Sequence, residues 1–219
     1  MNKIVAAFDG LKYAADTAQY AIELTRHTRS FLTGVFLDDF TYSSFKIYDL
    51  IQKNELSEKD LDEYRQKDQQ ARDKAADKFE TACRTAGIQY NVHRDKNICL
   101  RDLLHESIYA DLLVIDVKET FTHYDEKPPT RFVRDLLSDV QCPVLVVNKP
   151  WTPIERIVFL YDGAPSSVHA VKTFSYLFPE MVAQPCAVLS AKGYYRDLHL
   201  PDNNLMKEFM KRHYPKAAY

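Results

Sequence analysis

The residue types that most often carry chemistry are present in this sequence, but their spacing does not match known catalytic or metal-binding patterns. The seven histidines show no HxxH or HExxH spacing, and His123 with Asp125 supplies only two of the three or four ligands that a metal site needs. No G-x-S-x-G motif and no Walker-type phosphate loop occurs, and no cysteine has an obvious base beside it. We therefore expect neither a catalytic site nor a metal site.

The composition is that of an ordinary globular protein. Of the 219 residues, 46% are hydrophobic and 27% are charged, and the net charge of -2 gives no general attraction to nucleic acid or to a membrane. No apolar run is long enough to span a membrane, and the first residues do not resemble a secretion signal. The four cysteines are scattered without a CxxC pair, which favours reduced thiols and a cytoplasmic protein.

The chain uses one short pattern twice, and this duplication determines the expected domain organisation. IVAAFDG at 4–10 returns as IVFLYDG at 157–163, displaced by 153 residues, and at the same displacement Val35 corresponds to Val188. Each copy is an apolar run that ends in Asp-Gly and leads into a helical segment. Such a run is typical of a buried strand in a parallel sheet.

The first copy continues as alternating strands and helices. We expect strands at 4–10, 31–37, 88–94, 111–117 and 143–147, with helices at 14–27, 57–86, 98–108 and 130–140 between them. Ser57 is the expected N-cap of the long helix and Gly87 its stop. Five strands alternating with four helices predict an α/β fold with a doubly wound five-stranded parallel sheet.

Residues 38–56 interrupt this alternation with an apolar, aromatic segment that includes Phe45 and Tyr48. The segment follows the carboxyl end of a strand, where open α/β sheets bind their ligands. It is therefore either a lid or docking surface, or a hydrophobic cap that packs on the sheet edge.

The second copy is predicted to be partial. We assign 1–148 to a first domain, 149–154 to a linker, and 155–219 to an incomplete second domain with two strands and two helices. Two strands leave an exposed sheet edge and little core, so the sequence suggests a truncated copy of a longer tandem protein.

Three features together resemble the universal stress protein family. They are the strand that ends at Asp9 before a helix of small residues, the long charged helix, and the closing pair ADLLVIDV at 110–117 and QCPVLVV at 141–147. The resemblance covers most of 3–148 and begins again at 155. It implies a Rossmann-like sheet, a cytoplasmic location, and a homodimer or an intramolecular pseudo-dimer.

Nucleotide-binding members of that family carry a glycine signature after the fourth strand, where bare backbone can approach phosphate. The matching positions here are Val117, Thr120, Thr130 and Arg131, so the spacing is kept and every glycine is lost. The segment between them adds Asp125 and Glu126 near any phosphate. Only Arg131 and Lys127 in this stretch favour phosphate binding.

The resemblance also implies an adenine pocket beside Asp9 and Val35, with Asp162 and Val188 at the corresponding positions of the second copy. Asp9 could instead have a purely structural role in the turn that starts the helix, and Val35 could instead be a core residue. We expect a non-enzymatic stress-response protein, with no cofactor bound by its first domain and with an unidentified protein or small ligand as partner. The alternative is an ATP-binding, weakly hydrolysing protein that uses the second domain.

Overall fold

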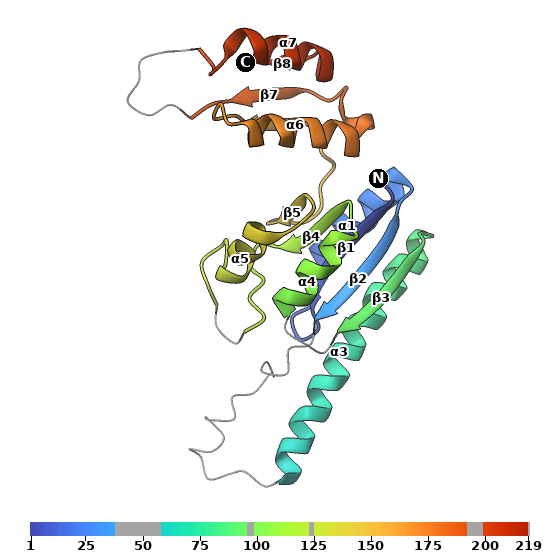
Figure 1. Ribbon diagram of the computed structural model, residues 1–219. Coiled ribbons are helices and arrows are strands. Elements are labelled where there is room, and N and C mark those ends of the chain that lie inside the picture. Colours follow the sequence, from blue (N-terminus) through green and yellow to red (C-terminus); the bar gives the residue numbers. More distant parts are fainter. Residues whose placement is uncertain (38–57, 96–98, 123–124, 192–198, 219) are drawn as a thin grey trace. The chain divides into compact units, whose positions relative to one another are not determined.

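The computed structural model describes the chain except for residues 38–57, 96–98, 123–124, 192–198 and 219 (Figure 1). The predicted aromatic segment and the expected N-cap Ser57 lie outside the described residues. The chain divides into unit 1, Met1–Trp151, and unit 2, Thr152–Tyr219, so the division falls inside the predicted linker.

Unit 1 contains the predicted five-stranded parallel sheet, which is confirmed. Its strands follow the order β3-β2-β1-β4-β5, and all four pairings are parallel. The strands are β1 (Lys3–Asp9), β2 (Phe31–Leu37), β3 (Tyr90–Asp95), β4 (Leu112–Asp116) and β5 (Val144–Val147). The apolar runs recognised in the sequence are buried on both faces, as in other parallel sheets covered by helices.

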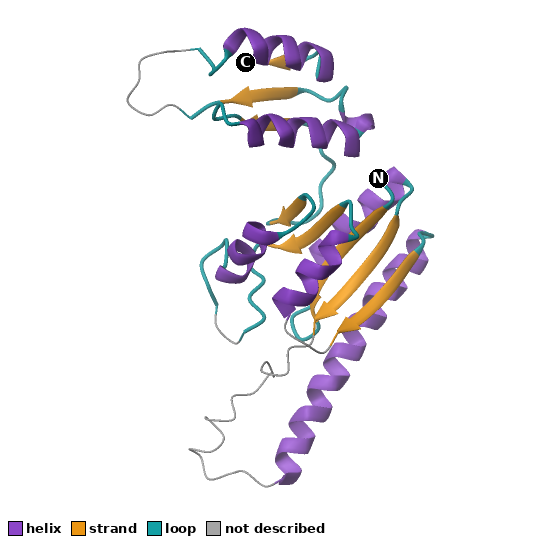
Figure 2. Cartoon of the chain, viewed as in Figure 1, coloured by secondary structure: helices purple, strands orange, loops and turns teal. Residues whose placement is uncertain are grey.

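Helices cover both faces of this sheet (Figure 2). They are α1 (Ala15–Thr28), α3 (Glu58–Ala86), α4 (Cys99–Ile108) and α5 (Arg131–Asp139). Helices α4 and α5 pack against Val5, Ala7 and Val35. The opposite face packs against α1 and α3. Gly87, the predicted stop of the long helix, has a φ of 66°, which glycine adopts without strain.

Phe79 of α3 is the centre of packing on that opposite face. Its side chain is fully buried, and its ring lies 5.2 Å from that of Phe8 and 5.8 Å from that of Phe36. A Cβ atom at Gly34 would lie 2.5 Å from this ring. The absence of a side chain at Gly34 therefore lets α3 approach the sheet closely.

Unit 2 is a three-stranded parallel sheet with the order β6-β7-β8. Its elements are β6 (Ile157–Leu160), α6 (Pro165–Leu177), β7 (Cys186–Leu189), α7 (Asn203–His213) and β8 (Ala217–Ala218), with a 3₁₀ turn at Pro179–Met181. The two-residue strand β8 was not predicted from the sequence. It is too short for any periodicity to reveal it.

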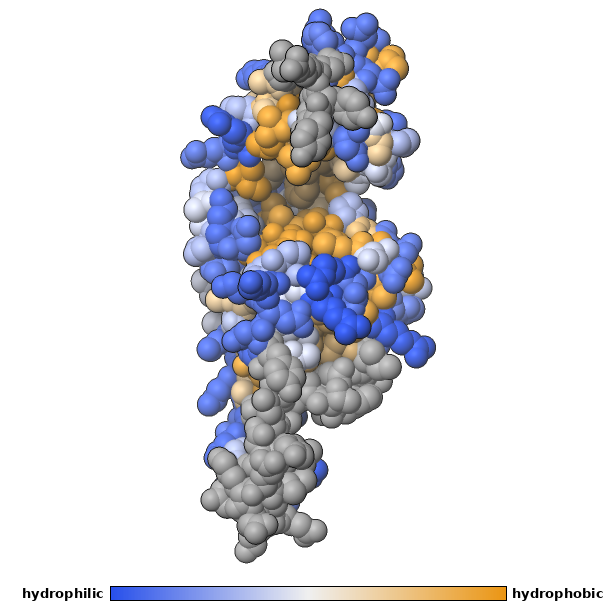
Figure 3. Space-filling model, turned by 90° about the vertical axis from the view of Figure 1, so that its left-hand side faces the viewer, coloured by the Kyte–Doolittle hydropathy of each residue, from blue (hydrophilic) through white to orange (hydrophobic). Residues whose placement is uncertain are grey.

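The helices of unit 2 lie on one face of its sheet. Val171 of α6 and Met206 and Met210 of α7 pack with Phe159 and Val188 in one buried cluster. On the other face, Val158, Leu160 and Leu189 are exposed, and apolar surface is visible on this unit in Figure 3. In unit 1 the corresponding face is buried beneath α4 and α5. Among the described residues, no helix is both long and apolar enough to cross a membrane.

Candidate functional site

The carboxyl ends of β1 and β4 are the candidate site of unit 1, and we call this position the crevice. The chain runs outward from β1 to β2 and β3, then returns to β4 on the other side, so the strand order reverses between β1 and β4. In open α/β sheets, ligands bind outside the carboxyl ends of the strands at such a reversal. The residues that end β1 and follow β4 therefore determine what this crevice can bind.

Asp9 ends β1 and is almost fully buried. Its Oδ1 accepts a hydrogen bond from the backbone N–H of Leu11 at 2.7 Å, which fixes the turn that leads toward α1. A Cβ atom at Gly10 would lie 2.8 Å from Cγ of Arg72, so α3 passes close to this turn. Asp9 therefore has the structural role that the sequence left open, and it also places a carboxylate in the crevice.

Residues 117–122, which we call the crevice loop, follow β4 and fold inward. The backbone N–H of Val117 donates to the carbonyl of Val147 at 2.8 Å and extends the pairing of β4 with β5. Glu119, Thr120 and Phe121 are then all buried. Phe121 packs on Phe132 of α5 at 4.6 Å between ring centroids. Where the resemblance implies bare backbone, this chain places three buried side chains.

Glu119 organises the crevice loop, although the sequence analysis did not single it out. Its Oε1 accepts hydrogen bonds from the backbone N–H groups of Thr120 at 3.0 Å and Phe121 at 3.3 Å. Its backbone carbonyl accepts a hydrogen bond from the Thr130 hydroxyl. Burial, and then the negative charge of Asp9, raise the pKa of Glu119 to about 8.

The start of α5 is already capped by the protein. Thr130 is the N-cap, and its Oγ1 accepts a hydrogen bond from the backbone N–H of Val133 at 3.2 Å. The backbone N–H of Arg131 donates to Oε2 of Glu126 at 2.6 Å. A helix N-terminus attracts anions, and here the carboxylate of Glu126 occupies that position.

The Arg131 side chain does not point into the crevice. It is 80% exposed and its Nε lies 3.5 Å from Oδ2 of Asp135, one turn further along α5. The sequence offered Arg131 as the one residue that could replace the glycines. Its side chain is in solvent and has an acidic neighbour, so that prediction has no support in the geometry.

The structure therefore brings some of the predicted site residues of unit 1 together and separates others from them. Asp9, Thr120 and Thr130 are brought together around Glu119. Val35 is fully buried in the core beneath α4 and α5, and Val117 serves the sheet through its backbone. Glu119 could have been noticed in the sequence as an acidic residue inside the segment where phosphate binding requires glycine.

The correspondence between Val35 and Val188 is wrong. Ile4 pairs with Leu32 in unit 1, whereas Ile157 pairs with Cys186 in unit 2. The crossover in unit 2 is therefore one residue longer than the crossover in unit 1. Val188 takes the position of Gly34 and faces the helices, while Leu189 corresponds to Val35. A one-residue change of register moves a side chain to the opposite face of the sheet.

Asp162 lies two residues after the end of β6 and is exposed. Its Oδ1 accepts a hydrogen bond from the backbone N–H of Ala164 at 2.9 Å. This bond, and then one with the Ser167 side chain, lower the pKa of Asp162. Asp162 thus forms the same kind of turn as Asp9, but without its burial.

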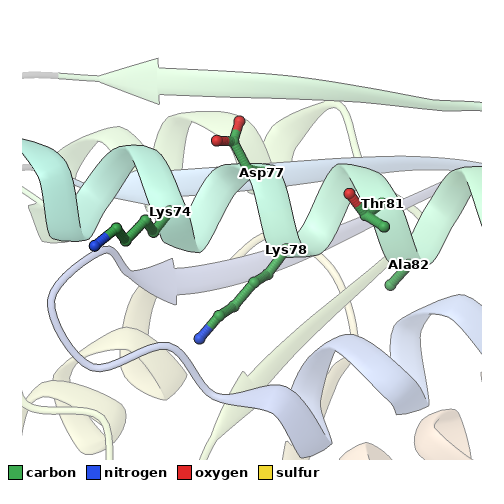
Figure 4. A pocket seen from close by; sticks show the side chains of 5 residues that line it. All are labelled: Lys74, Asp77, Lys78, Thr81 and Ala82. Carbon is green, nitrogen blue, oxygen red and sulfur yellow. The ribbon is translucent and has the colours of Figure 1, made fainter.

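The described residues offer little other chemistry. They contain no group of three or more His, Cys, Asp or Glu side chains that could hold a metal ion. Burial raises the pKa of the Cys83 thiol to about 12 and that of Cys142 to about 11, so neither is a reactive thiolate near neutral pH. A shallow depression of about 480 Å³ is lined by Lys74, Asp77, Lys78, Thr81 and Ala82, which all lie on α3 (Figure 4).

The three-dimensional structure resembles solved universal stress proteins. A universal stress protein from Archaeoglobus fulgidus matches 99% of this chain and 76% of its own, with a TM-score of 0.69 and 12% identity. The chain has the universal stress protein fold. A universal stress protein family structure from Burkholderia pseudomallei matches 68% of this chain and 96% of its own, with a TM-score of 0.41 and 19% identity.

A further universal stress protein, from Lactobacillus plantarum, matches 67% of this chain and 97% of its own, with a TM-score of 0.47 and 12% identity. No protein-family model matches the sequence, and no curated protein is similar to it. The resemblance to universal stress proteins inferred from the sequence is therefore confirmed at the level of the fold.

Proposed function

We propose that this chain is a non-enzymatic binding protein of the universal stress type, in which the unit 1 crevice does not bind ATP. The observation that carries the proposal is the inward-folded crevice loop, which puts Glu119, Thr120 and Phe121 where a nucleotide phosphate would need open backbone. A ligand would have to displace all three side chains before it reached the backbone.

Charge supports the same proposal. Asp9 and Glu119 place two carboxyl groups in the crevice, and Glu126 already bonds to the N-terminal amide of α5. ATP carries its charge on the phosphates, so the negative charges of Asp9 and Glu126 oppose it, and the protonated Glu119 offers it no positive charge. Three or four lost charge-assisted hydrogen bonds, at about 1.5 to 3 kcal/mol each, exceed the difference between micromolar and millimolar affinity.

A non-enzymatic role is supported by a serine–histidine contact in the described part of unit 2. The Ser175 hydroxyl lies 3.1 Å from Nδ1 of His213, but its own hydrogen is donated to the carbonyl of Lys172 at 2.7 Å. The contact therefore links α6 to α7 and leaves no free base beside a nucleophile.

Calorimetric titration of the full chain with ATP and magnesium tests the proposal. We expect a dissociation constant no better than about 1 mM, because the phosphate cradle is absent. Arg131→Ala is the matched control, and we expect it to change nothing, because the Arg131 side chain is in solvent. A micromolar constant that disappears in Arg131→Ala would mean that an arginine has replaced the glycines, and the proposal would be wrong.

We also propose that two chains associate through the free edge of β5, which is the last strand of the unit 1 sheet. The carbonyls of Pro143 and Val147 accept hydrogen bonds from β4, so the backbone groups of Val144 and Val146 point to the free edge. Unpaired edge groups on an apolar strand favour pairing with another chain.

Val146→Pro removes one edge donor and is expected to convert a dimer into a monomer in sedimentation experiments at micromolar concentration. Proline is tolerated at an edge position whose N–H is not used inside the sheet, so circular dichroism should show the fold retained. A wild-type chain that sediments as a monomer would remove the basis for this interface.

A further inference from the structure

Glu119 is a buried carboxyl group to which the proposed function gives no chemical role. The residue is 6% exposed, and its side chain accepts two backbone hydrogen bonds from the crevice loop that contains it. Its backbone carbonyl is bonded to Thr130 at the start of α5. This one carboxyl group therefore holds two backbone amides of the crevice loop in place.

The two charged side chains that act on Glu119 are also acidic. Asp9 at the end of β1 and Asp116 at the end of β4 both disfavour its negative charge. With burial as the largest cause, they raise the pKa of Glu119 to about 8, so its carboxyl group holds a proton near neutral pH. In the described part of the chain, further charged or titratable groups near the crevice loop and the Asp9 turn include Lys12, bonded to the Thr122 carbonyl; Arg72, against Gly10; Cys99 of α4, in the same cluster as Phe121; and Glu126, bonded at the start of α5.

Phe121 gives the crevice loop a conformation that is held under strain. Its φ is 50°, in the left-handed region that bulky residues rarely adopt. Its backbone N–H donates to Glu119, and its ring is buried against Phe132. Strained residues persist only where their surroundings hold them, so loss of the Glu119 contact should release this one.

We propose that Glu119 acts as a proton-controlled latch that closes the crevice loop over the unit 1 crevice. With its proton, Glu119 stays buried beside Asp9 and holds Thr120 and Phe121 inward. When the proton is lost to solvent, two neighbouring carboxylates are left buried, and Glu119 moves out with the loop. Asp9 and the start of α5 then become accessible. The inference rests on the proposed function in one respect, namely that the crevice loop is what fills the crevice.

Hydrogen exchange of the crevice loop as a function of pH tests the latch without any nucleotide. The closed state has a Glu119 pKa of about 8 and an opened, solvated carboxyl has the ordinary value of 4.5, so opening is linked to loss of one proton between these values. Protection of the Thr120 and Phe121 amides, corrected for the intrinsic exchange rate, is expected to fall about tenfold per pH unit from near pH 5 to near pH 8 and then to level off.

Two variants and one control complete the experiment. Glu119→Gln cannot ionise and should keep its protection at every pH, whereas Glu126→Gln, which changes an exposed carboxylate nearby, should follow the wild type. Asp9→Asn removes one negative charge that repels Glu119 and so lowers the pKa of Glu119. In this variant the protection of the Thr120 and Phe121 amides should level off at a lower pH than in the wild type. Wild-type protection that does not change with pH overturns the latch, as does an equal slope in Glu119→Gln. If Glu119→Gln does not fold, an unchanged profile in Asp9→Asn overturns it instead.

The latch and the proposed function can fail separately. A chain that binds ATP tightly could still show the predicted pH dependence of exchange. A chain that does not bind ATP could show none.

Discussion

Phe79→Ala is expected to lower the free energy of unfolding of unit 1 by about 3 to 5 kcal/mol, the usual cost of truncating a fully buried phenylalanine. The side chain is completely buried and contacts aromatic rings from β1, β2 and β3, so the resulting cavity cannot close easily. Urea unfolding followed by the fluorescence of Trp151 measures this loss, because Trp151 is the only tryptophan and packs on Tyr20 of unit 1.

Phe31→Ala is the matched control for this truncation. Phe31 begins β2 and is 37% exposed, so its loss should cost less than about 1 kcal/mol. Gly34→Ala supplies a second test, because the added Cβ would overlap the Phe79 ring and cost about 1 to 3 kcal/mol. In the Phe79→Ala background the same change should be almost neutral. Additive losses would show that the ring does not determine the requirement for glycine.

Glu119→Gln is expected to make the protein more stable at pH 8 and to flatten the pH dependence of its stability. In the wild type the pKa of Glu119 is raised in the folded state, so the folded protein binds the extra proton between the unfolded value and about 8. Stability is therefore greatest below pH 4.5 with respect to this group, and falls as the pH rises toward 8. The loss is on the order of 3 to 5 kcal/mol, and opening of the crevice loop limits it.

Urea unfolding at pH 5 and at pH 8, followed by Trp151 fluorescence, measures how the free energy of unfolding changes with pH in the wild type and in Glu119→Gln. We call this change the slope. Glu126→Gln changes an exposed carboxylate and should retain the wild-type slope. Equal slopes in the wild type and in Glu119→Gln would mean that Glu119 is ionised in the folded protein. The pair of buried carboxyl groups, Asp9 and Glu119, would then not make stability depend on pH.

The sheet of unit 1 could be predicted from the sequence because each strand is a local apolar run. β2 was predicted with its observed bounds, since Phe31–Leu37 is rich in β-branched and aromatic residues and ends beside turn residues. The long helix α3 was equally clear, because it ends at Gly87 and carries a periodic apolar stripe. These signals depend only on neighbouring residues.

The candidate site was harder to predict because its form depends on tertiary contacts. KETFT at 118–122 reads as a polar loop, yet Glu119 and Thr120 are buried there, because Thr130 and the N–H groups of the crevice loop satisfy their oxygens. The position of Val188 was also predicted wrongly, since a crossover longer by one residue changes the register without any local sign. The missing glycines, in contrast, were visible directly in the sequence.

If the unit 1 crevice is filled by the chain's own side chains, ATP cannot reach the backbone there, and amide chemical shifts measured during a titration with ATP and magnesium show whether it does. We expect that the amides of Thr120, Phe121 and Arg131 do not shift up to about 5 mM ATP at pH 6, where the crevice loop is closed. Shifts confined to residues after β6, such as Gly163 and Ala164, would place nucleotide binding in unit 2 instead. Saturating shifts of the three unit 1 amides with a submillimolar midpoint would mean that ATP enters the crevice and that the side chains there do not fill it.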